Sequence, residues 1–326
     1  MTGSDRVNLR GRTSQVRTPL VSIVVPTYNS ARFLASTVDS VTAQTFEDWE
    51  LVLIDDGSSD ETVQLSEQLA AGNPKIWAVV GSHGGPAVAR NEGLRHSDPR
   101  SEFVIFLDSD DRWAVEALET LLQALKDNPG CIAAHGLARS TNLQGVQYEA
   151  DDLADSMRHR RAVTANGFAD VPVSEPTTFA TMLVRNWIVT PGTCLIRRSV
   201  LDKVGAFDPE TSPADDWDLN IRLARAGNLA LVDRIVLDWR RHPDSLDNTN
   251  RRGRWAHLAV RRCTVRSPLN SQEQRRAALN IMRAESQSLW STMQAAMANR
   301  DLRRVIAEAR YWAASVASYW WVRLCG

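Results

Sequence analysis

The chain has 326 residues and a hydrophobic content of 43%, which allows a buried core; at a typical domain size of roughly 150 residues the length predicts about two folding units. The four cysteines stand far apart and include no Cys-x-x-Cys pair, so the sequence excludes a cysteine zinc site and a disulfide scaffold and fits a reducing cytoplasm. The net charge of −1 conceals a division, because residues 251–326 hold 14 arginines, no lysine and four acidic residues, giving +10, while the rest carries −11.

Residues 1–18 are polar and rich in arginine, which excludes a secretory signal and predicts a disordered tail. Beyond this tail, short apolar stretches alternate with helical patterns. The alternation predicts an α/β fold with a mainly parallel central sheet flanked by helices, in which ligands bind beyond the carboxyl ends of the strands. The predicted strands cover 21–25, 51–54, 76–80, 103–107 and 132–134, and the helices between them begin near Ser30, Ser59, Pro86 and Ala114.

Polar residues directly follow the first two predicted strands, at 26–29 and 55–60. Tyr28 offers a ring that can stack on a base, and Asp56 offers a carboxylate that can accept a hydrogen bond from an imide N–H or a ribose hydroxyl. Gly57 lets the backbone turn tightly. The alternative interpretation of residues 55–59 is an ordinary turn followed by a helix cap.

Three carboxylates, Asp108, Asp110 and Asp111, follow the fourth predicted strand within four residues. Carboxylates this close raise one another's pKa unless a cation lies among them, and Mg²⁺ or Mn²⁺ accepts such oxygen ligands. The cluster therefore indicates a metal that joins the protein to a diphosphate. The alternative is that Asp110 or Asp111 caps a helix beginning near Trp113. Both interpretations can hold for neighbouring residues of one turn.

In this order the motifs resemble the nucleotide-binding half of inverting family 2 glycosyltransferases, which have the GT-A fold. The family's Pro-x-Tyr-Asn and Asp-Asp-Gly-Ser turns match 26–29 and 55–58, its Gly-x-x-x-Ala-Arg-Asn-x-Gly helix start is similar to 85–93, and its DxD motif matches 108–110. The resemblance implies a divalent metal, Mg²⁺ or Mn²⁺, held by Asp110. It also implies a set of donor-nucleotide contacts, namely Pro26, Tyr28, Asp55, Asp56, Arg90, Asp108 and Asp110.

A second acidic group, at 215–218, precedes an amphipathic helix that ends at Gly227. Displacement with inversion needs one carboxylate to take the proton of the attacking hydroxyl. Since the group resembles the family's acidic-Asp-Trp-Asp pattern, Asp216 is the expected general base. Asp215, where many relatives carry Glu, and Asp218 are the expected supports. The alternative is that these carboxylates only complement the positive end of the helix.

Four more residues receive expected roles on the acceptor or diphosphate side. Trp187 and Trp217 offer rings for a sugar face, although packing in the core is the commoner role of such rings. The segment 240–245 resembles the family's Arg-x-His-Pro-x-Ser segment, which folds over the donor diphosphate. Arg240 and His242 are therefore expected at the diphosphate, and His242 also at the metal, although a lone histidine is more often structural.

Two regions match no catalytic motif of the family. Residues 145–180 show no sustained periodicity until about 179, which predicts a mobile loop near the active site where the acceptor is chosen. The last stretch has one apolar helical face, and its uncharged run at 311–322 is too short to span a bilayer, for which roughly 20 residues are needed. Arginine and tryptophan on such a helix suit an anionic inner leaflet, while docking on the catalytic domain or a second subunit explains the same face. The face comprises Leu302, Val305, Ile306, Ala309, Trp312, Ala313, Val316 and Trp320.

The sequence lacks the motifs that three other enzyme classes would carry. A dehydrogenase would carry Gly-x-Gly-x-x-Gly after the first strand, a sugar nucleotidyltransferase a glycine-rich loop there, and a processive synthase several membrane spans with Gln-x-x-Arg-Trp. We therefore expect an inverting, metal-dependent transferase that moves a single sugar from a UDP-sugar to a carbohydrate or lipid-linked glycan, as in polysaccharide or glycoconjugate synthesis. The alternative is a non-catalytic nucleotide-sugar-binding or scaffolding pseudoenzyme, against which Asp110 and Asp216 together argue.

The charge division and the motifs together predict three parts of the chain. These are the tail at 1–18, a GT-A catalytic domain at 19–247 and a basic amphipathic helical region at 248–326. The expected location is the cytoplasm, with attachment to the inner face of the membrane or homodimer formation through residues 255–326. No nucleic-acid partner is expected.

Overall fold

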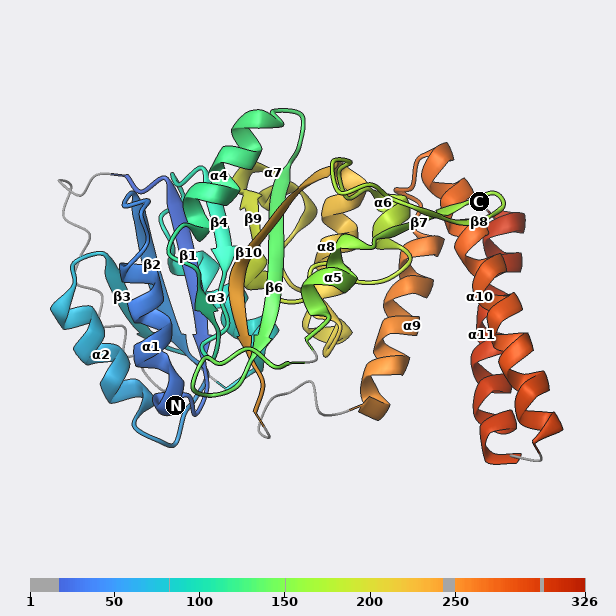
Figure 1. Cartoon of the computed structure of the whole chain (residues 1–326), viewed down its shortest axis with the longest axis horizontal. Helices are drawn as coiled ribbons and strands as arrows, with labels where there is room; N and C mark the ends of the chain where they lie inside the picture. Colours follow the sequence, from blue (N-terminus) through green and yellow to red (C-terminus); the bar gives the residue numbers. More distant parts are fainter. Residues whose placement is uncertain (1–17, 82, 150, 243–249, 300–301, 326) are drawn as a thin grey trace, which may run out of the picture.

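The computed structural model describes residues 18–81, 83–149, 151–242, 250–299 and 302–325. Apart from Thr18, the predicted disordered tail lies outside these residues, as does the predicted domain boundary near residue 247. Figure 1 shows a central sheet with helices on both sides and a group of long helices at one end of the molecule.

Eight strands form the central sheet in the order β3-β2-β1-β4-β9-β6-β10-β5. Strands β3, β2, β1 and β4 are parallel, as are β6 and β10, whereas β9 lies antiparallel between β4 and β6 and β5 pairs antiparallel with β10. This arrangement confirms the predicted α/β class with a mainly parallel sheet. The strands are β1 Val21–Thr27, β2 Trp49–Asp55, β3 Ile76–Val80, β4 Phe103–Phe106, β5 Arg112–Trp113, β6 Ala133–Thr141, β9 Cys194–Arg197 and β10 Leu229–Arg240.

The sheet separates two hydrophobic clusters, because successive side chains of a strand point to opposite faces. In β1, Ile23 and Val25 belong to one cluster and Val24 to the other. Leu34 of α1 and Leu121 of α4 lie fully buried on the side of Ile23. The helices of this part are α1 Ala31–Thr42, α2 Thr62–Gly72, α3 Pro86–His96, α4 Ala117–Asp127, α7 Arg198–Val204 and α8 Asp215–Ala226.

The chain after the aspartate cluster departs from the sequence prediction. Arg112–Trp113 forms the short strand β5, and the helix begins only at Ala117, with Glu116 at its N-cap position. Trp113 pairs with Leu237 at the sheet edge and donates its indole N–H to the carbonyl of Gly192 at 2.7 Å. Pairing and burial of Trp113 therefore outweigh the helical pattern. The interpretation of Asp110 or Asp111 as the cap of this helix is wrong.

Residues 145–180 contain regular elements where the sequence predicted an irregular, mobile loop. Arg160 lies here without exposed surface and holds the segment together. Its guanidinium donates to the hydroxyl of Thr177 at 2.6 Å and to the carbonyls of Pro172 and Glu175 at 2.8 and 2.7 Å. The elements are α5 Leu153–Arg158, the hairpin of β7 Arg161–Thr164 and β8 Gly167–Asp170, and the start of α6 Phe179–Met182.

The carboxyl-terminal helices pack on the catalytic fold. Val260 of α9 and Ile281 of α10 are buried in the same cluster as Trp217 of α8. Arg261 of α9 donates to Glu285 of α10 at 2.8 Å, and its guanidinium lies 5.1 Å from the Trp217 ring. None of the described helices is both long and apolar enough to cross a membrane. These helices are α9 Asn250–Arg266, α10 Gln272–Ala298 and α11 Leu302–Cys325.

Candidate active site

The polar turns that follow β1, β2 and β4 lie at one edge of the sheet. The strands are parallel neighbours, with Thr27 beside Asp55 and Val24 beside Phe106 in the register. The residues that follow each strand therefore meet in space, as the sequence predicted. This edge also receives the start of α3, whose first helical residue is Pro86.

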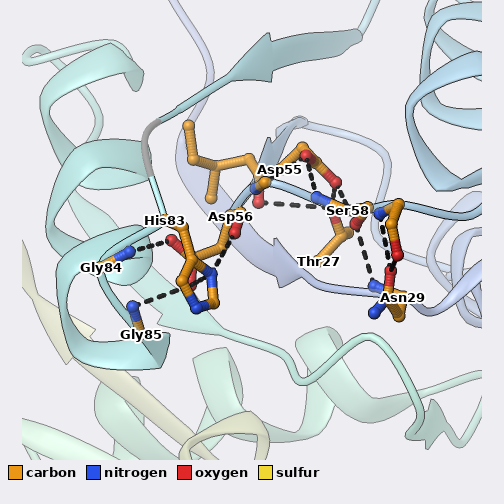
Figure 2. Close-up of polar contacts among 11 residues, drawn as sticks. Thr27, Asn29, Asp55, Asp56, Ser58, His83, Gly84 and Gly85 are labelled. Carbon is orange, nitrogen blue, oxygen red and sulfur yellow. Dashed lines mark hydrogen bonds and ion pairs between the residues drawn. The ribbon is translucent and has the colours of Figure 1, made fainter.

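Asp55 builds the turn after β2. Its carboxylate accepts hydrogen bonds from the backbone N–H groups of Gly57 and Ser58 at 2.9 Å each and from the Ser58 hydroxyl. Asn29, in the turn after β1, accepts from the Ser59 N–H at 2.8 Å, so the two turns are joined (Figure 2). Only 2% of Asp55 is exposed. The structure thus confirms that Asp55 forms a turn. Its predicted contact with the nucleotide stays a prediction.

Asp56 fixes the loop that leads into α3. Its two carboxylate oxygens accept from the backbone N–H groups of Gly84 and Gly85 at 2.7 and 2.8 Å, as Figure 2 shows. Gly85 has a φ of 87°, a conformation that favours glycine. His83 contacts the Asp56 carbonyl through Nδ1 at 2.8 Å. Asp56 therefore holds the helix start that carries Arg90.

An exposed pair of rings lies beside these turns. Tyr28 is 51% exposed, and its ring centroid is 4.9 Å from that of His83. Pro26, half-buried in β1, precedes Tyr28 by two residues. The prediction placed Tyr28 here but missed His83. Neither ring packs in the hydrophobic core, so both can stack on a flat ligand such as a base.

Arg90 is the cation that joins the aspartate cluster to the second acidic group. Its guanidinium donates to the carboxylates of Asp108 at 2.7 Å and Asp215 at 3.1 Å, and it is only 8% exposed. Burial alone would lower the pKa of Arg90, but the two carboxylates outweigh that effect and raise it. Arg90 therefore binds the aspartate cluster to the start of α8.

The Arg90 bridge predicts a large loss of stability when it is cut. Arg90→Met leaves the buried Asp215 carboxylate without its cation, and we expect the free energy of unfolding to fall by about 3–5 kcal/mol at pH 7. Urea denaturation measures this loss. Arg95→Met, at an exposed arginine 3.9 Å from Glu92 in the same helix, is the matched control and should cost about 0–1 kcal/mol. Equal losses in the two variants would contradict the bridge.

The three carboxylates of the aspartate cluster have different surroundings. Asp108 faces Arg90, whereas Asp110 meets Nε2 of His242 at 2.9 Å. Asp111 is 1% exposed and accepts from the hydroxyl of Thr190 and the N–H of Arg240, both at 3.2 Å. Burial and then the neighbouring carboxylates raise the pKa of Asp110 and, more strongly, that of Asp111.

Asp110 and His242 fit a divalent metal. Among the described residues no group of three acidic, histidine or cysteine side chains has a metal-binding arrangement. A metal that binds phosphates, however, often takes only one or two protein ligands and obtains the others from phosphate and water. Carboxylate oxygen and imidazole nitrogen are both suitable donors. A cation beside Asp110 would also relieve the repulsion that raises its pKa.

Arg240 lies beneath the cluster. Its guanidinium donates to the hydroxyls of Ser36 at 2.6 Å and Thr37 at 2.9 Å and to the carbonyl of Asp110, and 4% of the residue is exposed. It thus ties the end of β10 to α1 and to the cluster. Its predicted contact with the diphosphate stays a prediction, and these bonds favour a positioning role.

The second acidic group forms the first turn of α8, which begins four residues earlier than predicted. Asp216 is half-buried and accepts from the amide of Asn186 at 2.9 Å and from the N–H of Trp217 at 2.7 Å. Asn220 in turn donates to the amide oxygen of Asn186 at 3.1 Å. Burial, followed by the adjacent Asp215, raises the pKa of Asp216 to about 7.

Asp215 and Asp218 have supporting contacts. Burial raises the pKa of Asp215, against the opposing effect of Arg90. Asp218 pairs with Arg222 at 2.7 Å, and Arg222 also donates to backbone carbonyls after α7, including that of Gly205 at 2.8 Å. These contacts fix the start of α8 relative to α7. The supporting roles of Asp215 and Asp218 in the reaction stay predictions.

Both predicted aromatic residues of the acceptor side lie in the core. Trp187 is 4% exposed and donates its indole N–H to the Thr181 carbonyl at 2.9 Å, while Trp217 is 2% exposed and donates to that of Met182 at 2.9 Å. Buried rings cannot stack on a sugar. Of the two interpretations open from the sequence, core packing is the correct one for these rings, because α6 supplies an acceptor for each N–H.

The sequence of the chain matches a known family over most of the catalytic fold. The profile of the family described as "Glycosyl transferase family 2" matches residues 22–205. A protein of Bacillus subtilis strain 168 named "Putative teichuronic acid biosynthesis glycosyltransferase TuaG" is 37% identical over 110 residues, which are 33% of this chain and 43% of TuaG. The minor teichoic acid biosynthesis protein GgaA of the same strain is 40% identical over 115 residues, covering 33% of this chain and 25% of GgaA. The match thus spans less than half of either relative.

Solved structures share the fold. TarS residues 1–349 of S. aureus, in complex with UDP-GlcNAc, matches 93% of this chain and 81% of its own, with a TM-score of 0.66 and 19% identity. The mannosyltransferase PcManGT of Pyrobaculum calidifontis, in complex with GDP-Man and Mn²⁺, matches 94% of this chain and 88% of its own, with a TM-score of 0.58 and 19% identity. These likenesses confirm the GT-A-type fold.

Proposed function

Because the chain belongs to glycosyl transferase family 2, we propose that its crevice transfers one sugar from a nucleotide-diphospho-sugar to a carbohydrate or lipid-linked glycan, with inversion at the anomeric carbon. The observation that carries the proposal is the pair of contacts made by Arg90, at 2.7 Å to Asp108 and 3.1 Å to Asp215. Asp108 belongs to the cluster proposed for the donor, and Asp215 precedes the proposed base. One buried guanidinium thus lies between the two halves of the reaction.

The base and ribose of the donor are assigned to the edge beside Tyr28 and His83. Tyr28 has half of its surface exposed, and the Asp56 loop beside it presents the start of α3. UDP is the proposed nucleotide, supported by the UDP-GlcNAc in the TarS complex, whereas PcManGT was solved with GDP-Man.

Asp110 and His242 are the proposed protein ligands of a divalent metal, Mg²⁺ or Mn²⁺. When bound, the metal supplies positive charge to the departing diphosphate. Their 2.9 Å contact brings the two side chains together without the metal, which would replace this contact when bound, and Arg240 fixes the backbone of Asp110 from below. PcManGT was solved with Mn²⁺, which supports this assignment.

Asp216 is the proposed general base. A base must be ionised to take a proton, and a pKa of about 7 makes its carboxylate basic enough to do so near neutral pH. Arg90 and Asn186 favour the ionised form, one by charge and the other by a hydrogen bond. Asp216 also adjoins a small, mostly apolar pocket with Phe106 and Phe207 in its wall.

The acceptor is proposed to be a glycan or lipid-linked glycan of a cell-surface polysaccharide, synthesised at the inner face of the membrane. The names of TuaG and GgaA, which concern teichuronic and teichoic acid biosynthesis, support this class. The single-sugar reaction is proposed because the sequence lacks the Gln-x-x-Arg-Trp motif of processive synthases.

A thermal-shift screen tests the proposed function directly. The full chain is heated with UDP-, GDP- and dTDP-sugars, each with and without Mn²⁺. We expect one nucleotide class to raise the Tm in the presence of Mn²⁺ and much less in its absence, because bound ligand stabilises the folded state. If no nucleotide sugar raises the Tm under either condition, the donor assignment is wrong.

The contact between Asn186 and Asp216 predicts a shift in pH dependence. Asn186→Ala removes a hydrogen bond to the ionised form of the base. A hydrogen bond to a charged group contributes about 1.5 kcal/mol, which corresponds to about one pKa unit. The apparent pKa on the acidic limb of the kcat/KM profile should therefore rise by about one unit. Activity at pH 6 should thus fall more than activity at pH 8. Asn91→Ala, which loses a 2.8 Å bond to the Phe207 carbonyl instead, is the control and should not move the limb. An unmoved limb in Asn186→Ala would rule out this role.

A further inference from the structure

Helices α10 and α11 form an antiparallel pair at the end of the molecule farthest from β3 (Figure 1). The inner side of α10 packs on the catalytic fold, with Ala278, Ile281 and Met282 almost fully buried. Tyr311 and Ser315 of α11 are also buried, and Ser315 bonds to Glu285 of α10 at 3.1 Å. The pair is therefore firmly attached, and its remaining sides face outward.

The outer side of each helix combines arginine with large apolar side chains. On α10, Arg276, Arg283, Trp290 and Met297 follow one another at seven-residue steps, which places them in one stripe, and all four are exposed. Trp290 and Met297 are 44% and 52% exposed. We call one exposed stripe of each helix, taken together, the outer surface, namely Arg276, Arg283, Trp290 and Met297 of α10 with Ile306, Arg310, Ala313, Ala317 and Trp320 of α11.

The stripe of apolar residues predicted at 302–320 is divided between two surfaces. Trp312 and Val316 are half-buried, and Trp312 meets Trp290 with ring centroids 5.5 Å apart. Ile306 and Trp320, in contrast, are 57% and 49% exposed. Packing within the protein thus explains only part of the stripe. The exposed part adds apolar area to the outside of the helix pair.

The charge of the outer surface is positive because its acidic neighbours are buried or paired. Glu285 pairs with Arg261 at 2.8 Å, and Glu308 is only 5% exposed. Among the described residues of α10 and α11, Glu273 is the exposed acidic side chain, and it lies in the first turn of α10. The region 251–326 carries 14 arginines against four acidic residues. The partner of this surface should therefore be anionic.

We propose that the outer surface docks on an anionic lipid bilayer. Tryptophan and other large apolar side chains insert at the headgroup level, and arginines beside them bind anionic headgroups. A second copy of the chain would bring like charges together if the same surface paired with itself. A nucleic acid would leave Met297, Ile306 and Trp320 without an apolar environment. The surface thus lies on the membrane, and the inference is independent of the reaction proposed above.

Flotation of the full chain with vesicles tests the proposal. Binding is compared on phosphatidylcholine alone and on phosphatidylcholine mixed with phosphatidylglycerol, at low and high salt. We expect binding to the anionic vesicles only, weakened by salt. The partition coefficient of the variant Arg276→Glu/Arg283→Glu/Arg310→Glu should fall at least about a hundredfold. The variant Trp290→Ser/Trp320→Ser should also bind more weakly than the wild type, at low salt and at high salt alike. Point variants are preferable to deletion, since Val260 and Ile281 belong to the common core.

A control variant replaces three cations by glutamate on the catalytic fold, away from the outer surface, so that its net charge changes by the same amount. Arg95→Glu/Lys126→Glu/Lys203→Glu changes three exposed cations of the catalytic fold and should float like the wild type. Circular dichroism and Tm show that each variant is folded, and Mn²⁺-dependent nucleotide binding should be unchanged in the outer-surface variants. The proposal is overturned if the wild type does not float with anionic vesicles, if both triple variants lose binding equally, or if light scattering shows a dimer that the outer-surface variants dissociate.

Discussion

Asp216→Asn is expected to lower the kcat of sugar transfer by about 10²–10⁴-fold, the usual contribution of a positioned general base. The affinity for the nucleotide sugar should stay unchanged, because Asp216 belongs to the second acidic group and not to the residues proposed to bind the donor. The amide cannot take the proton of the attacking hydroxyl, although it has nearly the same size as the carboxyl group. Initial rates measure kcat, and calorimetric titration of the nucleotide measures affinity.

The raised pKa of Asp216 predicts how stable the Asp216→Asn variant should be, and a stability measurement therefore shows whether the variant is folded. In the wild type the carboxyl pKa is raised from 3.8 to about 7, so the unfolded chain loses its proton first as pH rises. The stability that this group contributes therefore falls as pH rises from about 4 to about 7, by up to 1.36 kcal/mol for each unit, and the loss remains in full above about pH 7. Asp216→Asn lacks this loss and should be at least as stable as the wild type at pH 8. A variant that is stable, binds donor and still turns over normally would contradict the base assignment.

Asp110→Ala is expected to remove the Mn²⁺-dependent part of nucleotide affinity. Asp110 provides the carboxylate of the proposed metal site, and loss even of an outer partner of a metal ligand typically costs 10–100-fold in metal affinity. We therefore expect a loss of more than about a hundredfold in UDP affinity at saturating Mn²⁺. Calorimetry with UDP, with and without Mn²⁺, measures both terms. The metal-independent term should remain, since Tyr28 and the Asp56 loop are untouched.

A matched control separates this effect from a general loss of charge. Asp202→Ala removes an exposed aspartate of α7, outside the crevice, and should leave UDP affinity unchanged. His242→Ala should weaken the Mn²⁺-dependent term in the same direction as Asp110→Ala. If Asp110→Ala binds UDP and Mn²⁺ as tightly as the wild type, the metal does not lie at the aspartate cluster.

The sequence predicted the position of the crevice because it depends on strand order and short-range pattern. Apolar stretches marked β1, β2 and β4, and parallel pairing brings their carboxyl ends together whatever the detailed packing. Asp108 and Asp110 were therefore placed correctly at the same edge as the turns 26–29 and 55–60, whereas Arg90 was assigned through the resemblance to the family. The contact between Arg90 and Asp215, which are 125 residues apart, had no local signal.

Residues whose roles depend on side-chain contacts could not be assigned from the sequence. Asn186 reaches Asp216 only because α6 and α8 pack together, and its amide gives no pattern along the chain. Trp187 and Trp217 looked alike as sugar platforms or core residues until α6 supplied acceptors for both N–H groups. A sequence motif indicates which residue type lies at a position, but only the three-dimensional structure shows whether its side chain is buried or can contact a ligand.

The prediction of the helix after the cluster failed for a related reason. The helical pattern from Ala114 was correct in its apolar spacing, yet Trp113 pairs with Leu237 at the edge of β10. Pairing with a distant strand outweighs local propensity over a few residues. Residues 145–180 are ordered for a different reason, because the buried Arg160 bonds to Pro172, Glu175 and Thr177 of the same segment and a single arginine gives no such signal in the sequence.

The anomeric configuration of the product tests the central claim most directly. A nucleotide α-sugar chosen by its Mn²⁺-dependent rise in Tm is incubated with the enzyme, and proton NMR follows the anomeric signal from the first turnovers. A crevice with one base, Asp216, and a bound donor opposite predicts the β-configured product, whether the acceptor is a glycan or water. An α-configured product, or a bound donor that is never consumed by the wild type with any glycan acceptor, would contradict the account.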